Sequence, residues 1–110
     1  MKNSFVLFSA GMLASCSLDG RDGSIAVAND TNETVKLSSL HIKNRSELVG
    51  LTLEPNRSVT LRNVPEIEGD VKLRYARASG GHDLFIGYNS PGMGINCVVV
   101  LGPEADTVYC

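Results

Sequence analysis

The C-terminal residues 96–110, NCVVVLGPEADTVYC, decide the fold. Two runs rich in β-branched residues flank the tetrapeptide 102–105, whose Gly and Pro favour a turn. Such a pattern predicts two antiparallel strands joined as a hairpin. A hairpin centred between Pro103 and Glu104 places Cys97 directly opposite Cys110.

The two cysteines of this hairpin are expected to form a disulfide. Directly opposed residues on antiparallel strands lie about 4.5–5.5 Å apart, which a disulfide can bridge. Closing a loop this short contributes about 3 kcal/mol to stability. The chain has three cysteines, so Cys97 and Cys110 remain as an even pair if Cys16 is used otherwise.

The chain before the hairpin repeats the same strand pattern. Short runs in which apolar residues alternate with polar ones are separated by Gly, Pro, Asn and Ser. No segment has a convincing helical period. The predicted strands are residues 24–28, 34–42, 48–53, 58–64 and 70–76, a strand marked by Leu84, Ile86 and Tyr88, and residues 96–101 and 106–110.

Two of these strands carry more detailed predictions. The apolar residues of 34–42 change face at Ser38 and Ser39, which predicts a β-bulge or a strand that crosses between sheets. The unbroken apolar run 98–101 predicts a strand that is buried on both faces.

Seven or eight short strands in one chain predict an all-β domain, either an antiparallel sandwich or a small β-barrel. The stretch LEPNRSVTL at residues 53–61, followed by Val64 and Pro65, resembles hairpins common in bacterial immunoglobulin-like and transthyretin-like domains. The resemblance implies a sandwich of one of these two kinds. A chain of 110 residues has room for only one such core.

The composition argues against several classes of ligand. The 10 basic and 12 acidic residues are interspersed, without the basic stripe that nucleic acid or anionic lipid would require. Aromatic residues make up only 5% of the chain and Trp is absent, so platforms for a sugar or another small molecule are few. We expect no nucleic acid, no small-molecule substrate and no cofactor.

The first sixteen residues have the anatomy of an export signal. Lys2 precedes an apolar stretch over residues 5–14, which is too short to span a bilayer as a permanent helix. The stretch ends in LASC at residues 13–16. This motif resembles the lipobox of bacterial lipoproteins, in which a branched apolar residue and two small residues precede the lipidated cysteine.

The lipobox resemblance implies a precursor in three parts. These are a signal peptide over residues 1–15, the lipidated Cys16 with a short tether to residue 23, and a single β domain over residues 24–110. The residue after the lipidated cysteine is Ser17 rather than Asp. In a bacterial lipoprotein, a residue other than Asp at this position favours location in the outer membrane, with the domain facing the periplasm.

Four Asn-x-Ser/Thr sites leave a secreted eukaryotic glycoprotein as a minor alternative. Asn, Ser and Thr also concentrate in β-turns for conformational reasons. All four sites fall at predicted turns or strand ends, so the turn explanation is preferred. The sites begin at Asn29, Asn32, Asn44 and Asn56.

No set of residues in the sequence specifies a reaction. His41 is predicted to face solvent on its strand, and His82 to lie beside Asp83 at a turn tip without a third metal ligand nearby. No Gly-x-Ser-x-Gly motif or Ser-His-Asp spacing is present. Glu66 and Glu68 fall in a predicted solvated loop rather than at positions suited to glycoside hydrolysis. We expect neither enzymatic activity nor a metal site.

The Gly/Pro-rich connection 87–96 is the candidate partner-binding loop. Its apolar residues are costly to expose without a purpose. Met93 could serve as an apolar knob for a partner, or Met93 and Ile95 could fold back to cap the core. The candidate contact residues are Tyr88, Pro91, Met93 and Ile95.

The expected location and the expected fold suggest two functions. The first is a structural or protein-interaction module of the cell envelope, held to the membrane by its N-terminal lipid. The second is an inhibitor or exclusion factor that blocks a hydrolase or a receptor.

Overall fold

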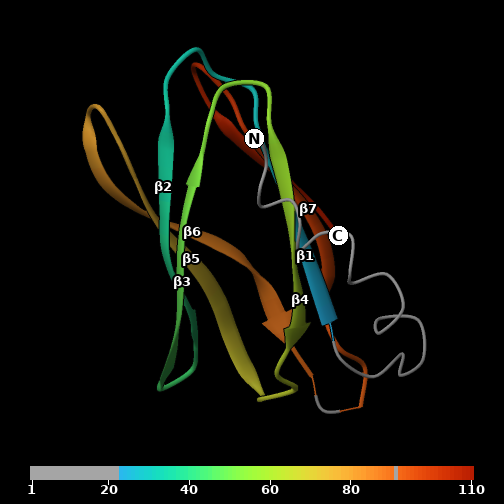
Figure 1. The fold of residues 1–110 in the computed structure, drawn as a ribbon. Coiled ribbons are helices and arrows are strands. Elements are labelled where there is room, and N and C mark those ends of the chain that lie inside the picture. The colour runs from blue at the N-terminus through green and yellow to red at the C-terminus, as the bar shows by residue number, and fades with distance from the viewer. Residues whose placement is uncertain (1–22, 91) are drawn as a thin grey trace.

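Eight strands form two four-stranded sheets whose inner faces pack against each other (Figure 1). The computed structural model describes residues 23–90 and 92–110, so the predictions on the signal peptide, on Cys16 and on Pro91 lie outside the described residues. The strands are β1 (Gly23–Asn29), β2 (Val35–Ile42), β3 (Arg45–Leu53), β4 (Ser58–Val64), β5 (Gly69–Arg77), β6 (Gly80–Asn89), β7 (Asn96–Leu101) and β8 (Asp106–Tyr109).

The first sheet has the strand order β4-β1-β7-β8 and the second sheet the order β3-β2-β5-β6. Two separate packed sheets confirm the predicted all-β sandwich in preference to a barrel. The pairing of β1 with β7 is parallel, so the first sheet is mixed rather than purely antiparallel. An immunoglobulin domain groups its first, second, fifth and fourth strands in one sheet. That order is not found here, so the sandwich does not have the immunoglobulin strand order.

No helix occurs among residues 23–90 and 92–110, and hence none there has the length and apolar character needed to cross a membrane.

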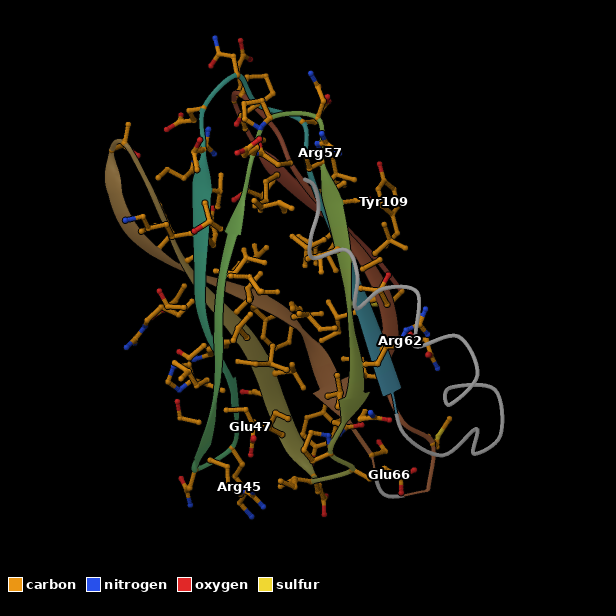
Figure 2. All side chains as sticks on the ribbon, in the orientation of Figure 1. Arg45, Glu47, Arg57, Arg62, Glu66 and Tyr109 are labelled. Carbon is orange, nitrogen blue, oxygen red and sulfur yellow. A yellow bond between two sulfur atoms is a disulfide. The ribbon has the colours of Figure 1, made fainter. Side chains whose placement is uncertain are left out.

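The core consists of aliphatic side chains that alternate with outward-facing residues along each strand. Ile25 and Val27 of β1 are fully buried, as are Val71 and Leu73 of β5. The period of two along a strand puts every second side chain on the inner face. Figure 2 shows side chains filling the space between the sheets. Each buried side chain of this size contributes about 1.5–3 kcal/mol, so the core is the main source of stability.

The predicted β-bulge in β2 is confirmed. The pairing of β2 with both β3 and β5 shifts register between Leu37 and Ser39. Leu37 lies in the core before the shift, and Leu40 and Ile42 lie in the core after it. The apolar residues of β2 are at odd positions before the bulge and at even positions after it. The extra residue of the bulge therefore keeps both sets of side chains in the core.

A second bulge, in β6, interrupts the alternation of Leu84, Ile86 and Tyr88. Val71 pairs with Gly87 while Lys72 pairs with Phe85, which leaves Ile86 as the extra residue. Beyond the bulge, Tyr88 points outward and is 55% exposed. Asn89 takes the inward position and is fully buried.

The expectation that the run 98–101 is buried on both faces is wrong. Val99 and Leu101 are fully buried, whereas Val98 is 44% exposed and Val100 is half-buried. Their side chains alternate between the core and the outer face of the first sheet. No third layer covers that outer face within the described part of the chain.

The predicted C-terminal hairpin and its disulfide are confirmed. Leu101 pairs with Asp106 and Val99 with Val108, as the turn position required. Cys97 and Cys110 are disulfide-bonded, with a Cα–Cα distance of 4.1 Å. The bond fixes the last residue of the chain to β7, in the interior of the first sheet.

Two groups of polar side chains link the two sheets at one end of the sandwich. In the first, the buried amide of Asn29, on β1, donates hydrogen bonds to the carbonyls of Leu53 (2.9 Å) and Glu33 (2.8 Å). Its oxygen accepts from the Thr31 backbone N–H at 3.0 Å. The end of β1 is thereby tied to the end of β3 on the opposite sheet.

The second group joins β5 to the C-terminal hairpin. The Tyr75 hydroxyl donates to the carboxylate of Asp106, the first residue of β8. Arg77 donates to the Gly102 carbonyl at 3.1 Å and lies 3.5 Å from the carboxylates of Asp106 and Glu33. Burial, together with the neighbouring Asp106, raises the pKa of Tyr75 to about 12.

Candidate functional site

The outer face of the second sheet contains a hollow of about 580 Å3. Strands β2, β5 and β6 form its floor, and Lys43 in the turn after β2 and Glu68 in the connection before β5 complete it. Apart from Gly69, the residues that line it are polar or charged. They are His41, Lys43, Glu68, Gly69, Asp70, Lys72, Arg74, Asp83 and Tyr88.

Strand register brings these side chains together from distant parts of the sequence. His41 of β2 pairs with Lys72 of β5, which in turn pairs with Phe85 of β6. In the next row, Arg74 of β5 pairs with Asp83 of β6. Directly opposed residues on neighbouring strands point to the same face of a sheet, so both rows point away from the core.

An ion pair between Arg74 and Asp83 crosses the hollow from β5 to β6. It has two contacts: Nε to Oδ1 at 2.8 Å and Nη2 to Oδ2 at 3.2 Å. The hydrogen bond from Arg74 lowers the pKa of Asp83, and the nearby His41 and Lys72 lower it further. Both side chains are about half exposed, and exposed pairs of this kind add little to folding stability. The pair instead fixes the position of two charges on an open surface.

The other end of the hollow is formed around Tyr88. The Tyr88 hydroxyl donates to Glu68 at 2.8 Å. This hydrogen bond and the charges of Glu68 and Asp70 raise the pKa of Tyr88. The hollow as a whole contains three basic and three acidic side chains. Balanced charge of this kind suits a surface with both signs, such as a protein, better than a phosphate or a metal ion.

Large apolar side chains lie on the same outer face as the hollow, one on each edge strand of the sheet. Leu48 of β3 is 87% exposed and Phe85 of β6 is 53% exposed. Leu48 pairs with Ser39 and Phe85 with Lys72, so both lie on the same face as the charged residues. Exposed aromatic and apolar residues around Arg and Tyr are the usual composition of a protein-binding surface.

The loop predicted to contact a partner has both exposed and buried residues. Met93 is 73% exposed at the tip, where its N–H donates to the Ser90 carbonyl at 3.1 Å. Ile95 is 5% exposed and packs with the core, and its carbonyl accepts from Ser24 N–H at 2.8 Å. In this fold Ile95 caps the core and is too buried to contact a partner. Met93 and Tyr88 do have such a surface, and Pro91 lies outside the described residues.

The two histidines have structural contacts. On the outer face of β2, His41 Nε2 lies 3.0 Å from the Ser39 hydroxyl. At the β5–β6 hairpin, the ring of His82 stacks on Tyr75 with 5.3 Å between ring centres. Within residues 23–90 and 92–110, no three His, Cys, Asp or Glu side chains are grouped as metal ligands.

The four Asn-x-Ser/Thr sites lie at turns and strand ends, as predicted. Asn29 ends β1, and Asn32 lies between β1 and β2. Asn44 and Asn56 lie in turns, and Asn56 has a φ of 64°. Asn and Asp tolerate this left-handed conformation better than other non-glycine residues. The side chain of Asn29 is buried and hydrogen-bonded, so the folded domain does not present it for glycosylation.

The charged hollow could not be predicted from the sequence. The alternation in residues 70–76 does place Lys72 and Arg74 on the outer face. Their neighbours on β6, Asp83 and Phe85, depend on strand order and on the bulge at Ile86, which no local pattern specifies. No protein-family model matches the chain, and no curated protein matches it in sequence.

Proposed function

We propose that this chain is the precursor of an exported, lipid-anchored β domain that serves as a protein-interaction module of the cell envelope. The support for export is the signal-like segment that ends in LASC at residues 13–16. The disulfide between Cys97 and Cys110 agrees with it, because such bonds persist in oxidising compartments outside the cytoplasm. In this proposal the lipid is attached to Cys16 and inserts into the outer membrane, and the β domain faces the periplasm.

The proposed partner-binding surface is the outer face of the second sheet. The observation that carries this assignment is the mixed-charge hollow around Arg74 and Asp83, bordered by exposed Phe85, Tyr88 and Leu48. A partner with a complementary mixed-charge surface and an apolar rim would bury these side chains. Arg and aromatic residues carry most of the binding energy in such interfaces.

The anchor is tested by an intact mass measured without reductant. The full chain, expressed in a Gram-negative host, is extracted from membranes. We expect a mass equal to residues 16–110 plus acyl chains, less two hydrogens for the disulfide. Cys16→Ser is the matched control and should leave the chain unlipidated. A soluble, unlipidated wild-type product would contradict the proposal and favour the secreted glycoprotein.

The binding surface is tested by a photo-crosslinking residue at Phe85 in the same host, compared with one at Met93. We expect adducts with an envelope protein from position 85, and at least a tenfold loss of adduct when Arg74→Glu is added. Adducts that form equally well with Arg74→Glu, or only from position 93, would contradict the assignment.

A second candidate function is an inhibitor that inserts the 87–96 loop into a hydrolase or receptor. The exposure of Met93 at the tip of a loop fixed by Ile95 favours it. If the protein is an inhibitor, it should capture a single enzyme in a fixed stoichiometry, and the Met93→Asp variant should not capture it. Unchanged capture by Met93→Asp would exclude it, whereas recovery of a multi-protein envelope complex favours the interaction module.

A further inference from the structure

A narrow apolar slot lies between the two sheets, on the side where β3 and β4 form the sheet edges. Each of these strands is the first in the strand order of its sheet, so neither has a second neighbour among the described strands. The slot has a volume of about 270 Å3. Its apolar lining consists of Leu40, Val49, Leu51, Leu61, Val64 and Pro65. Figure 2 shows Glu47 of β3 and Arg62 of β4, which also line the slot, on opposite sides of it.

The slot leaves side chains that face the core partly uncovered. Val49, Leu51 and Leu61 pack against the core but are only partly buried. Leu51 pairs with the buried Leu37, so its side chain lies on the inner face of its sheet. Covering such side chains with further apolar groups is favourable, because it removes apolar surface from water. The slot shares no residue with the charged hollow of the second sheet and is a separate site.

The free edge of β4 is suited to pair with one more strand. β4 pairs with β1 in an unbroken antiparallel register from Ser58 to Arg62, so the main-chain groups on its other side form a regular row. The edge of β3 is less regular, because its register with β2 shifts at Gly50, whose φ is 63°. A strand added beside β4 would point every second side chain inward, next to Val59 and Leu61 and over the slot.

We propose that the slot and the free edge of β4 together bind an extended segment of another protein by β-strand addition. Main-chain hydrogen bonds to β4 provide the affinity in this mode of binding, and side chains at alternate positions of the segment provide the specificity. Inward positions of the segment are apolar and fill the slot. An acidic residue at an outward position near Arg62 meets a charge of opposite sign. A small apolar molecule could fill the slot, but it would leave the row of main-chain groups beside it unused.

Other sources of the strand fit the slot less well. A folded second copy keeps the inward side chains of its own strands in its own core, so it has none to place in the slot. The tether of this chain over residues 17–22, SLDGRD, has Leu18 as its one large apolar residue. The apolar run over residues 5–14 does not alternate, so as an added strand it would also expose apolar side chains outward. The proposal concerns a surface other than the hollow and does not depend on the lipid anchor.

The proposal is tested with a short synthetic peptide in which valine alternates with threonine and a glutamate at one end meets Arg62. Its binding to the full chain, purified from the same host, is measured by calorimetry. We expect saturable binding at peptide concentrations up to about 1 mM. Leu51→Glu should weaken this binding at least tenfold. Thr52→Glu is the matched control and should leave it unchanged, because Thr52 is exposed on the opposite face of β3.

Methylation of the peptide main chain separates strand pairing from apolar contact alone. Successive N–H groups of a strand point to opposite edges, so N-methylation of every second residue blocks one edge, and N-methylation of the other residues blocks the other edge. We expect one of these two peptides to bind wild-type protein at least tenfold more weakly than the parent peptide, and the other to bind equally well. The comparison does not depend on the folding of any variant.

Two results would overturn the proposal. Equal affinities of the two methylated peptides would show that the peptide does not pair along one free edge. Failure of the parent peptide to bind would leave the slot to the N-terminal segment of this chain or to a second copy.

Discussion

The two sheets share one core but differ in their outer faces and in how the chain builds them. Their inner faces are mainly aliphatic and share one core, to which Val27 and Val99 of the first sheet and Val71 and Leu73 of the second belong. The first sheet has two uncharged outer rows, and the second has a hollow with charges of both signs. Only inward positions are constrained by packing, so the outer positions of each sheet are free to acquire separate roles.

The sheets also differ in the sequence distance between paired strands. The second sheet is built from two hairpins, β2–β3 and β5–β6, that join through β2 and β5. The first sheet places β1 between β4 and β7, so Ser24 pairs with Asn96 near the other end of the chain. Long-range pairing carries a larger loop-closure cost before contacts form. The disulfide lies within the first sheet, and the two polar links join that sheet to the second.

The largest expected effect is on the disulfide of the first sheet. Replacing Cys97 and Cys110 together with Ala should lower the free energy of unfolding by about 3 kcal/mol, because the 13-residue separation is no longer closed. Urea denaturation without reductant measures the loss. Reduced wild-type protein is the control and should lose a similar amount. An unchanged midpoint would show that the hairpin needs no covalent bond.

The next effect concerns the link between the sheets through Tyr75. The pKa of Tyr75 is about 12 in the fold and about 10 in an unfolded chain. The contribution of Tyr75 to the free energy of unfolding is therefore at its full value below about pH 10. It falls by about 2 to 3 kcal/mol as the pH rises toward 12. Urea midpoints across this pH range measure the fall. Tyr75→Phe should flatten the profile, and an equally steep profile in Tyr75→Phe would assign the fall to another group.

A comparable loss is expected at the second link between the sheets. Asn29→Ala removes the amide donor to the Leu53 carbonyl and the oxygen that accepts from the Thr31 N–H, while the Glu33 carbonyl keeps the Thr31 hydroxyl as a donor. The cost of such buried unpaired groups is about 1–3 kcal/mol. Asn32→Ala is the matched control, because Asn32 is exposed in the next Asn-x-Thr site. Equal denaturation midpoints for the two variants would remove Asn29 as a link.

The smallest effect on stability is expected at the charged face of the second sheet. Arg74→Ala and Asp83→Ala break an exposed ion pair, which contributes little to folding. Their thermal midpoints should equal that of the wild type, while crosslinking from position 85 should fall. A clear loss of stability in both variants would give the pair a structural role and weaken the contrast between the two outer faces.

Local patterns in the sequence predicted most of the fold. The period of two located the strands to within a few residues, and Ser38 and Ser39 marked the bulge because apolar parity changes there. The register of the last hairpin followed from the turn at residues 102–105 and the two cysteines. These features depend on residues close in sequence, which is why they could be predicted.

What the sequence did not reveal depends on which strands become neighbours. The run 98–101 resembles a strand covered on both faces, yet Val98 is open because no layer covers the first sheet among the described residues. Arg74 and Asp83 meet only because β5 and β6 pair in a particular register. Phe85 joins them on that face as the residue just before the bulge. Non-local pairing of this kind leaves no signature in residue spacing.

The position of β1 in the interior of the first sheet has a consequence for the timing of folding. Its two neighbours are β4 and β7, and both are far from it in sequence: β1 ends at Asn29, whereas β7 begins at Asn96. Contacts between distant parts of a chain form late and slowly. The first sheet therefore cannot close until β7 has left the ribosome, and β1 stays without one of its two neighbours while the residues between them are made.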